Sequence, residues 1–342
     1  MQHKPWLIIV SPALAAANNG NWQTAWRWSR LLSPHYRCRI VQAWTAAEAG
    51  AKDEPAQAML ALHARRSAAS IQAWSQAYPG AGLAVVLTGT DLYRDIQNNR
   101  EAQASLQLAQ RLVVLQELGP DALPIALRSK CRVIFQSTTA RQSLEKSASH
   151  LRAMMVGHLR EEKSPQTLFQ AAYLLQQRND ILIDHLGAEL DPVLGELAQQ
   201  TALACPHYRW LGERGHEATR RHIQRAHVLV HCSQMEGGAH VLMEAMRCGT
   251  PVLASRIAGN IGMLGQDYAG FFEWGDAQAL AKLLQRCRDE PELLAQLRSQ
   301  CSQRAPLFAP ARERAALIEL IDELRVSLRG RPSAPSSTEK EP

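Results

Sequence analysis

The chain has 342 residues, of which 46% are hydrophobic and 20% are charged. At ~100–200 residues per domain, this length indicates two domains and excludes a peptide or a disulfide-stapled miniprotein. No stretch of the sequence approaches the ~18 continuous apolar residues that a membrane-spanning helix needs. The net charge of +6 suits an anionic ligand, but it falls short of the concentrated basic face of a nucleic-acid-binding protein.

The cysteines and the N-terminal segment indicate in which cellular compartment the protein is expected. The seven cysteines are an odd number, and no two stand at C-x-x-C spacing or in a Cys/His cluster. We interpret them as buried thiols in a reducing, cytoplasmic environment. The apolar stretch 6–17 is interrupted by Pro12 and preceded by few positive charges, so we interpret its start as a buried strand and not as a signal peptide.

Short apolar runs alternate with helical patterns along the chain, which predicts an α/β fold with parallel sheets covered by helices. The expected strands of the first half are 6–10, 39–41, 59–64, 84–88, 111–116 and 131–136. Those of the second half are 153–156, 181–186, 208–211, 227–232 and 251–255. The apolar period of Trp22 to Leu32 predicts a helix. Two Rossmann-like domains are therefore expected, with the ligand between them.

The expected N-terminal domain covers residues 1–150. The expected C-terminal domain covers 151–328 and includes a final helix, 312–328, which is helical by period and rich in ion-pairing residues. Residues 329–342 contain Pro, Ser and charged residues with little to bury, which predicts a disordered tail.

The segment 233–252 follows a predicted strand, turns through Gly237 and Gly238, and continues as a helix that stops at Gly249. Two glycines at a helix start let backbone N–H groups approach a phosphate at the positive end of the helix dipole. Glu244 lies about one and a half turns into this helix. Its carboxylate could accept hydrogen bonds from two neighbouring hydroxyls, such as those of a ribose.

Glu236, seven intervening residues, Glu244 and the residues that follow resemble the E-x₇-E element of the retaining nucleotide-sugar glycosyltransferases of family 4, which have the two-domain GT-B fold. The resemblance implies that Glu244 holds the nucleotide ribose and that Glu236 lies over the donor sugar. It also implies that the residues between them bind the diphosphate through their backbone amides. The expected donor-binding residues are Glu244, Gly237, Gly238, Ala239 and His240.

The segment from Val156 onward resembles the one that opens the second domain of this family. Ser164 is suited to an N-cap, so Lys163 stands at the mouth of the next helix, where a cation can meet the leaving diphosphate. The family usually has Arg directly after the glycine, where this chain has His158. Arg160 projects to the same side of an extended strand end and is expected to replace it. The expected catalytic residues are Glu236, Lys163 and Arg160.

A narrower resemblance extends from about Trp6 to about Leu324. It is to the selenosugar synthases of selenoneine biosynthesis, and it rests on the segments 18–24, 62–67, 88–95 and 259–265. It implies that selenophosphate attacks a UDP-sugar, either UDP-N-acetylglucosamine or UDP-glucose, and that a 1-selenosugar forms with loss of UDP and phosphate. Thr90 stands where the wider family commonly has a His near the donor sugar.

A trianionic acceptor requires cations and amide or hydroxyl donors, which the first half carries at its predicted strand-to-helix turns. The expected acceptor-binding residues are Asn19, Gly20, Asn21, Arg65, Arg66, Thr88, Thr90 and Arg94. Selenophosphate is an ionised nucleophile that needs no general base, so we interpret His63 as a packed or hydrogen-bonded side chain. No cofactor and no metal are expected, because the chain has no Asp-x-Asp run.

Two alternatives remain open at this point. The first is a UDP-sugar-dependent transferase that acts on a hydroxyl of a small sugar or lipid, although the first half has no long apolar or basic amphipathic stretch that would favour a lipid. The second is a non-catalytic UDP-sugar-binding module. The family pattern implies retention at the anomeric carbon, whereas a strong nucleophile leaves inversion open. Neither a nucleic-acid partner nor membrane insertion is expected.

Overall fold

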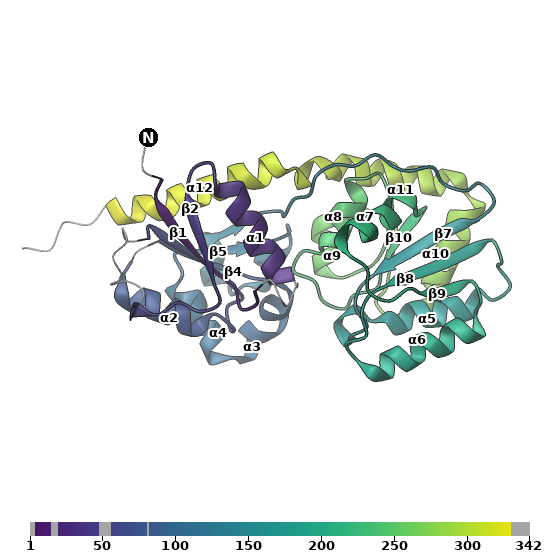
Figure 1. The fold of residues 1–342 in the computed structure, drawn as a ribbon, viewed down its shortest axis with the longest axis horizontal. Coiled ribbons are helices and arrows are strands. Elements are labelled where there is room, and N and C mark those ends of the chain that lie inside the picture. Colours follow the sequence, from purple (N-terminus) through teal and green to yellow (C-terminus); the bar gives the residue numbers. More distant parts are fainter. Residues whose placement is uncertain (1–3, 15–19, 48–55, 81, 330–342) are drawn as a thin grey trace, which may run out of the picture.

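The computed structural model describes residues 4–14, 20–47, 56–80 and 82–329. It contains two six-stranded sheets, ordered β2-β1-β3-β4-β5-β6 and β12-β11-β10-β7-β8-β9, whose paired strands run parallel. Figure 1 shows the two sheets in two halves of the molecule, each with its own helices. The predicted α/β class is therefore confirmed.

The strands of the first sheet are β1 (Trp6–Val10), β2 (Arg37–Val41), β3 (Ala58–Leu62), β4 (Gly82–Val86), β5 (Arg111–Val114) and β6 (Cys131–Val133). The helices between them are α1 (Gly20–Leu32), α2 (Ala68–Ala77), α3 (Ile96–Asn98) and α4 (Arg100–Leu108). The strands of the second sheet are β7 (Leu151–Val156), β8 (Ile181–Leu186), β9 (Tyr208–Trp210), β10 (Val228–His231), β11 (Val252–Ser255) and β12 (Phe271–Phe272). The remaining helices are α5 (Pro165–Leu174), α6 (Pro192–Ala204), α7 (His216–Arg225), α8 (His240–Met246), α9 (Ala258–Leu264), α10 (Ala277–Asp289), α11 (Pro291–Arg304) and α12 (Pro310–Arg329).

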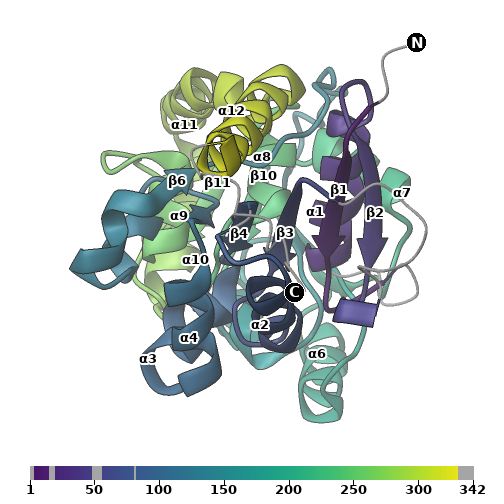
Figure 2. The same cartoon turned by 90° about the vertical axis from the view of Figure 1, so that its left-hand side faces the viewer.

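The first sheet is buried on both faces. Leu7 and Ile9 of β1 belong to one apolar cluster, whereas Ile8 and Val10 belong to the cluster on the opposite face. Successive side chains of a strand point to opposite faces, so a strand that is covered on both sides is a continuous apolar run. Helices α2 and α4 cover one face and α1 and α12 cover the other (Figure 2).

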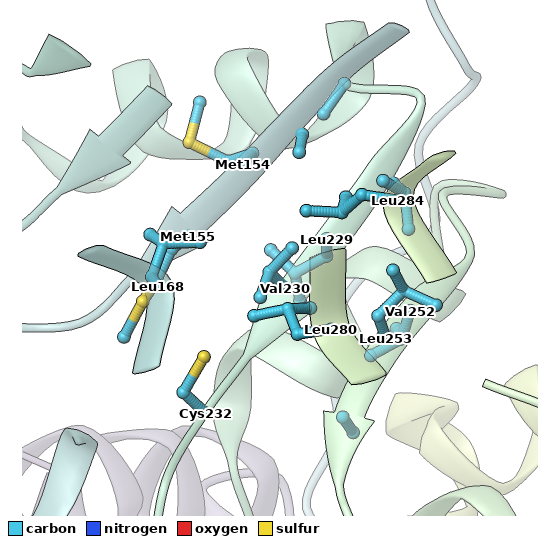
Figure 3. Packing of buried hydrophobic residues seen from close by; sticks show 14 of the residues in the cluster. Met154, Met155, Leu168, Leu229, Val230, Cys232, Val252, Leu253, Leu280 and Leu284 are labelled. Carbon is cyan, nitrogen blue, oxygen red and sulfur yellow. The ribbon is translucent and has the colours of Figure 1, made fainter. Parts of the chain in front are cut away.

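The second sheet is covered in the same way. Met154 of β7, Leu229 of β10 and Leu253 of β11 are fully buried and belong to one cluster. Leu280 and Leu284 of α10 are spaced four residues apart, so they lie on one face of the helix and reach this cluster together (Figure 3). The sheet therefore provides a rigid base for the loops at the carboxyl ends of its strands.

Helix α12 returns to the first half. Its apolar residues Leu317, Leu320, Ile321 and Leu324 pack in the cluster that contains β1 and β3, and the helix lies along the first half in Figure 1. The sequence placed this helix in the domain 151–328 by chain order, but its core contacts are with the other sheet. The domain bounds 1–150 and 151–328 stay a prediction. The tail expected over 329–342 falls outside the described residues, apart from Arg329, which ends α12.

The seven cysteines are free thiols. Five of them are buried as expected, whereas Cys38 and Cys131 are only half-buried. Within the described ranges, no helix is both long enough and apolar enough to span a lipid bilayer.

Candidate functional site

The two halves meet at the double-glycine turn before α8. A Cβ atom on Gly237 would lie 2.5 Å from the carbonyl carbon of Thr88, and one on Gly238 would lie 2.8 Å from Cβ of Leu115. Side chains do not approach a backbone this closely, so glycine at these positions lets the second half pack directly against the first. The structure thus brings the expected donor turn beside the expected acceptor segment at Thr88.

Glu236 begins this turn and is held by two basic side chains. The Nζ atom of Lys163 donates to its Oε1 at 2.5 Å, and Nε2 of His231 lies 3.4 Å from the same oxygen. Burial alone would raise the pKa of Glu236, but the nearby Lys163 and His231 outweigh this effect and hold the pKa well below its usual range. Glu236 is therefore an ionised, largely buried acceptor at neutral pH.

Glu244 lies on α8 and is buried, with 8% of its surface exposed. Nε2 of His216, the first residue of α7, lies 2.6 Å from its Oε1, and Nε of Arg220 lies 4.0 Å from that oxygen. The hydrogen bond to Glu244 raises the pKa of His216 above its ordinary value. The carboxylate therefore faces two basic side chains of α7.

The segment before α5 differs from expectation in its details. Ser164 occupies the N-cap position, but its backbone φ is 46° and its side chain makes no capping hydrogen bond. Its Oγ instead accepts from Nε1 of Trp274 at 2.9 Å. Arg160 is exposed and lies 3.9 Å from Glu162, and Nδ1 of His158 accepts from the Ala188 amide at 3.0 Å. Lys163, the next residue along this loop, is the one that contacts Glu236 in the described part of the chain.

The expected acceptor segment surrounds a buried carboxylate that the sequence analysis missed. Asp91 accepts from the amide and hydroxyl of Thr88 at 2.7 and 2.8 Å, and from the Ala64 amide at 2.9 Å. It begins a π-helical turn, Asp91–Asp95, an irregularity that is frequent at functional sites. The spacing of two aspartates by four residues was the available signal in the sequence.

His63 follows β3 and is 2% exposed, with a positive φ of 73°. Its Nε2 lies 3.3 Å from Oγ1 of Thr90, and its Nδ1 accepts from the Arg66 amide at 3.3 Å. Burial lowers the pKa of this imidazole. His63 is therefore packed and hydrogen-bonded, as expected, and it lies directly beside Thr90.

The cations expected for the acceptor are partly paired. Nε of Arg65 donates to Asp95 at 2.8 Å, and Nε of Arg94 lies 3.5 Å from the other oxygen of that carboxylate. Arg66 is exposed on the same turn. Gly20 and Asn21 start α1, whereas Asn19 lies outside the described residues. The structure therefore groups Arg65 and Arg94 around Asp95, which the sequence analysis had not singled out.

The sequence analysis also missed His216, because no local pattern links it to a glutamate 28 residues later in the chain.

The described part of the chain contains no group of three or more His, Cys, Asp or Glu residues that could hold a metal ion.

Solved structures of several proteins resemble this fold. Sucrose-phosphate synthase from Thermosynechococcus elongatus superposes with a TM-score of 0.73 and 18% identity over 95% of this chain and 100% of its own. HepE from Anabaena, solved with UDP and glucose, gives a TM-score of 0.71 and 15% identity over 94% of this chain and 100% of its own. A variant of Staphylococcus aureus TarM, solved with UDP, gives a TM-score of 0.62 and 12% identity over 77% of this chain.

This chain spans only 55% of the TarM chain. The likenesses show the fold, which is the GT-B arrangement of two Rossmann-like units. The sequence model of the family "Glycosyl transferases group 1" matches residues 136–306, half of the chain, and this match includes Lys163, Glu236 and Glu244. The chain belongs to the group 1 glycosyl transferases.

Proposed function

We propose that this protein transfers a sugar from a UDP-sugar to selenophosphate. The observation that carries the donor assignment is the pair of carboxylates at the two ends of 236–244, of which Glu244 is buried and Glu236 largely buried, each held by basic side chains. HepE and TarM, which share the fold, were solved with UDP. In this proposal the second half binds the donor and the first half binds the acceptor.

The donor extends along the segment from Glu244 to Glu236. Glu244 accepts hydrogen bonds from the ribose hydroxyls, and the backbone N–H groups of Gly238, Ala239 and His240 donate to the diphosphate. Glu236, kept ionised by Lys163, accepts from hydroxyls of the transferred sugar. The donor sugar is N-acetylglucosamine or glucose.

Lys163 neutralises the charge that develops on the leaving diphosphate. An ammonium group has three donors, so Lys163 can keep its hydrogen bond to Glu236 and still donate to phosphate oxygens. Interactions that strengthen as charge develops lower the barrier of the transfer step. Arg160, exposed on the same loop, adds a second positive charge.

The acceptor assignment rests on the sequence resemblance and on the arginines and hydroxyls beside Asp91 and Asp95. Selenium attacks C1 of the sugar and forms the C–Se bond, while the C–O bond to the diphosphate breaks and its electron pair leaves with UDP. Water then cleaves the Se–P bond, which releases phosphate and leaves the 1-selenosugar. Arg65, Arg66, Thr88 and Thr90 hold the anionic part of the acceptor.

The test is incubation with a panel of UDP-sugars, with and without selenophosphate, followed by mass spectrometry of the products. We expect UDP, phosphate and a selenosugar only when both substrates are present. If UDP is released at the same rate without selenophosphate, or if a product forms on an added sugar or lipid hydroxyl, selenophosphate is not the acceptor. A protein that binds UDP but never releases it from a UDP-sugar would be a binding module.

A further inference from the structure

Arg27 lies in the middle of α1, and its side chain reaches His240 at the start of α8. Its Nε donates to both carboxylate oxygens of Glu313, at 3.2 and 3.0 Å. Glu313 belongs to the first turn of α12, and its side chain is fully buried. One edge of the guanidinium is therefore fixed by a buried carboxylate.

Glu313 is held independently of Arg27. Nε1 of Trp28 donates to it at 2.7 Å, and the amide and hydroxyl of Ser137 donate at 2.8 and 2.5 Å. A buried carboxylate is tolerated only when hydrogen bonds satisfy it. Because Trp28 and Ser137, from two different segments of the chain, hold Glu313 in place, this carboxylate sets the position and the rotamer of Arg27.

The other edge of the guanidinium faces the second half. Nη1 lies 3.4 Å from Nε2 of His240, whose pKa is held well below its ordinary value by burial and by Arg27, so the imidazole is neutral and can accept. Nη2 of Arg27 is buried and has no hydrogen-bond partner among the described residues. Such a donor costs free energy unless a ligand accepts from it.

The position of His240 identifies the ligand group. It stands four residues from both Glu236 and Glu244, so it lies midway along the segment that spans donor sugar and ribose in the proposed function. The diphosphate is the part of a UDP-sugar that lies between these two groups. A guanidinium suits a phosphoryl group better than an ammonium does, because its planar fork can donate two parallel hydrogen bonds.

We propose that Arg27 binds the diphosphate of the donor from the first half of the molecule, and that Glu313 is the positioning residue that aims it. The proposal rests on the function proposed above, and it adds to the donor site a phosphate-binding residue that no motif in the sequence indicates. It also links α12 to the donor site through the ion pair between Glu313 and Arg27.

The test measures the affinity of uridine, UMP and UDP by calorimetry for the wild type and for Arg27→Ala, Arg27→Lys and Glu313→Gln. Arg27→Ala should weaken UDP binding about ten- to a hundred-fold and leave uridine unchanged. Arg27→Lys keeps the charge but loses the planar fork, so its UDP affinity should lie between those of the wild type and Arg27→Ala. Arg30→Ala is the matched control, because Arg30 is an exposed arginine of the same helix.

Glu313→Gln tests the positioning role. Glutamine keeps a single acceptor oxygen, which can still accept from Ser137 where Oε2 does now, while it loses the charge that orients Arg27 and the acceptor for Trp28. We expect a smaller loss of UDP affinity than for Arg27→Ala, and almost no further loss in the double variant. Additive losses in the double variant would show that Glu313 does not act through Arg27. Thermal melting of each variant identifies any that unfold, and Arg27→Lys then carries the test.

Two outcomes would overturn the proposal. If Arg27→Ala weakens uridine and UDP equally, the residue is structural. If it leaves UDP affinity intact but raises KM for selenophosphate, Arg27 belongs to the acceptor. Inorganic pyrophosphate separates this proposal from the proposed function: a wild type that binds pyrophosphate through Arg27 but no UDP would contradict only the function. A wild type that binds UDP independently of Arg27 would contradict only the inference.

Discussion

His216 Nε2 and Glu244 Oε1 lie 2.6 Å apart, so the carboxylate proposed for the ribose already has a hydrogen-bond partner within the protein. The imidazole is largely exposed whereas the carboxylate is buried. We expect ribose hydroxyls that bind Glu244 at Oε1 to displace His216. This competition makes donor binding depend on the protonation of His216.

We expect UDP affinity to rise with pH because of this pair. Glu244 raises the pKa of His216, and an imidazole displaced by ribose returns toward its ordinary pKa of ~6.5. UDP binding then releases a proton in the window between these two values, so affinity increases as pH rises through it. The other charged groups around the pair are Arg220 and Glu217 of α7.

The measurement is UDP affinity by calorimetry from pH 6 to 9, given as the ratio of wild type to His216→Gln. The ratio removes the ionisation of UDP itself. A ratio that does not change with pH would contradict the competition, and a ratio that falls with rising pH would show that His216 helps to hold the ligand.

Lys163→Ala should lower kcat more than it raises the donor KM, by ~10²-fold if the loss resembles that of one oxyanion donor. Lys163 also lowers the pKa of Glu236, so its removal should raise that pKa and leave His231 alone to oppose the effect of burial. The variant should therefore lose further activity as pH falls. Steady-state kinetics across pH checks both effects, with the exposed Lys282→Ala as control. A change confined to KM would limit Lys163 to ground-state binding.

Arg65→Ala should raise the selenophosphate KM about ten-fold or more and leave UDP affinity nearly unchanged, because the two substrates occupy different halves. The ion pair with Asp95 fixes Nε of Arg65 and orients the rest of the fork. Arg65→Lys keeps the charge but loses this geometry, so it should rescue only part of the loss. Kinetics at saturating donor makes the measurement, with the exposed Arg100→Ala as control. Loss of UDP binding in Arg65→Ala would place this arginine at the donor.

Gly237→Ala should lower kcat by ~10²-fold without unfolding the protein. The new Cβ would meet the backbone of Thr88 and Gly89 at 2.5 to 2.7 Å, and the two halves must separate to accept it. A displacement of about 1 Å between reacting groups is sufficient for such a loss. Gly215→Ala is a matched control, because nothing lies within 4 Å of its added Cβ. Wild-type kcat in Gly237→Ala would show that this contact is not needed for transfer.

Much of the fold could be predicted because its strands are buried on both faces. The run 6–10 is apolar throughout, the run 181–186 is apolar apart from Asp184 and His185, and both are strands with these bounds. β12 could not be found, since two residues have no detectable period. The packing of α12 was equally hidden, because an apolar stripe shows which face is covered but not which sheet covers it.

The candidate site likewise has a part that the sequence predicts and a part that it does not. Glu236, Glu244 and Lys163 lie in short motifs, and two of them prove to be hydrogen-bonded to each other. His216 and Arg27 reach the same segment from elements distant in the chain, so their contacts depend on how the helices pack. The predicted N-cap of Ser164 failed for a local reason, since a positive φ accompanies a side chain bonded to Trp274 instead.

The return of α12 to the first sheet also orders events during synthesis. Leu317, Leu320 and Leu324 fill one face of a sheet whose strands leave the ribosome long before them. Domains usually fold in the order in which they emerge. Here the first sheet emerges first but completes its core last, so its uncovered face must wait until the second half has been translated. A nascent chain stalled before Pro310 should therefore expose apolar surface on the first sheet.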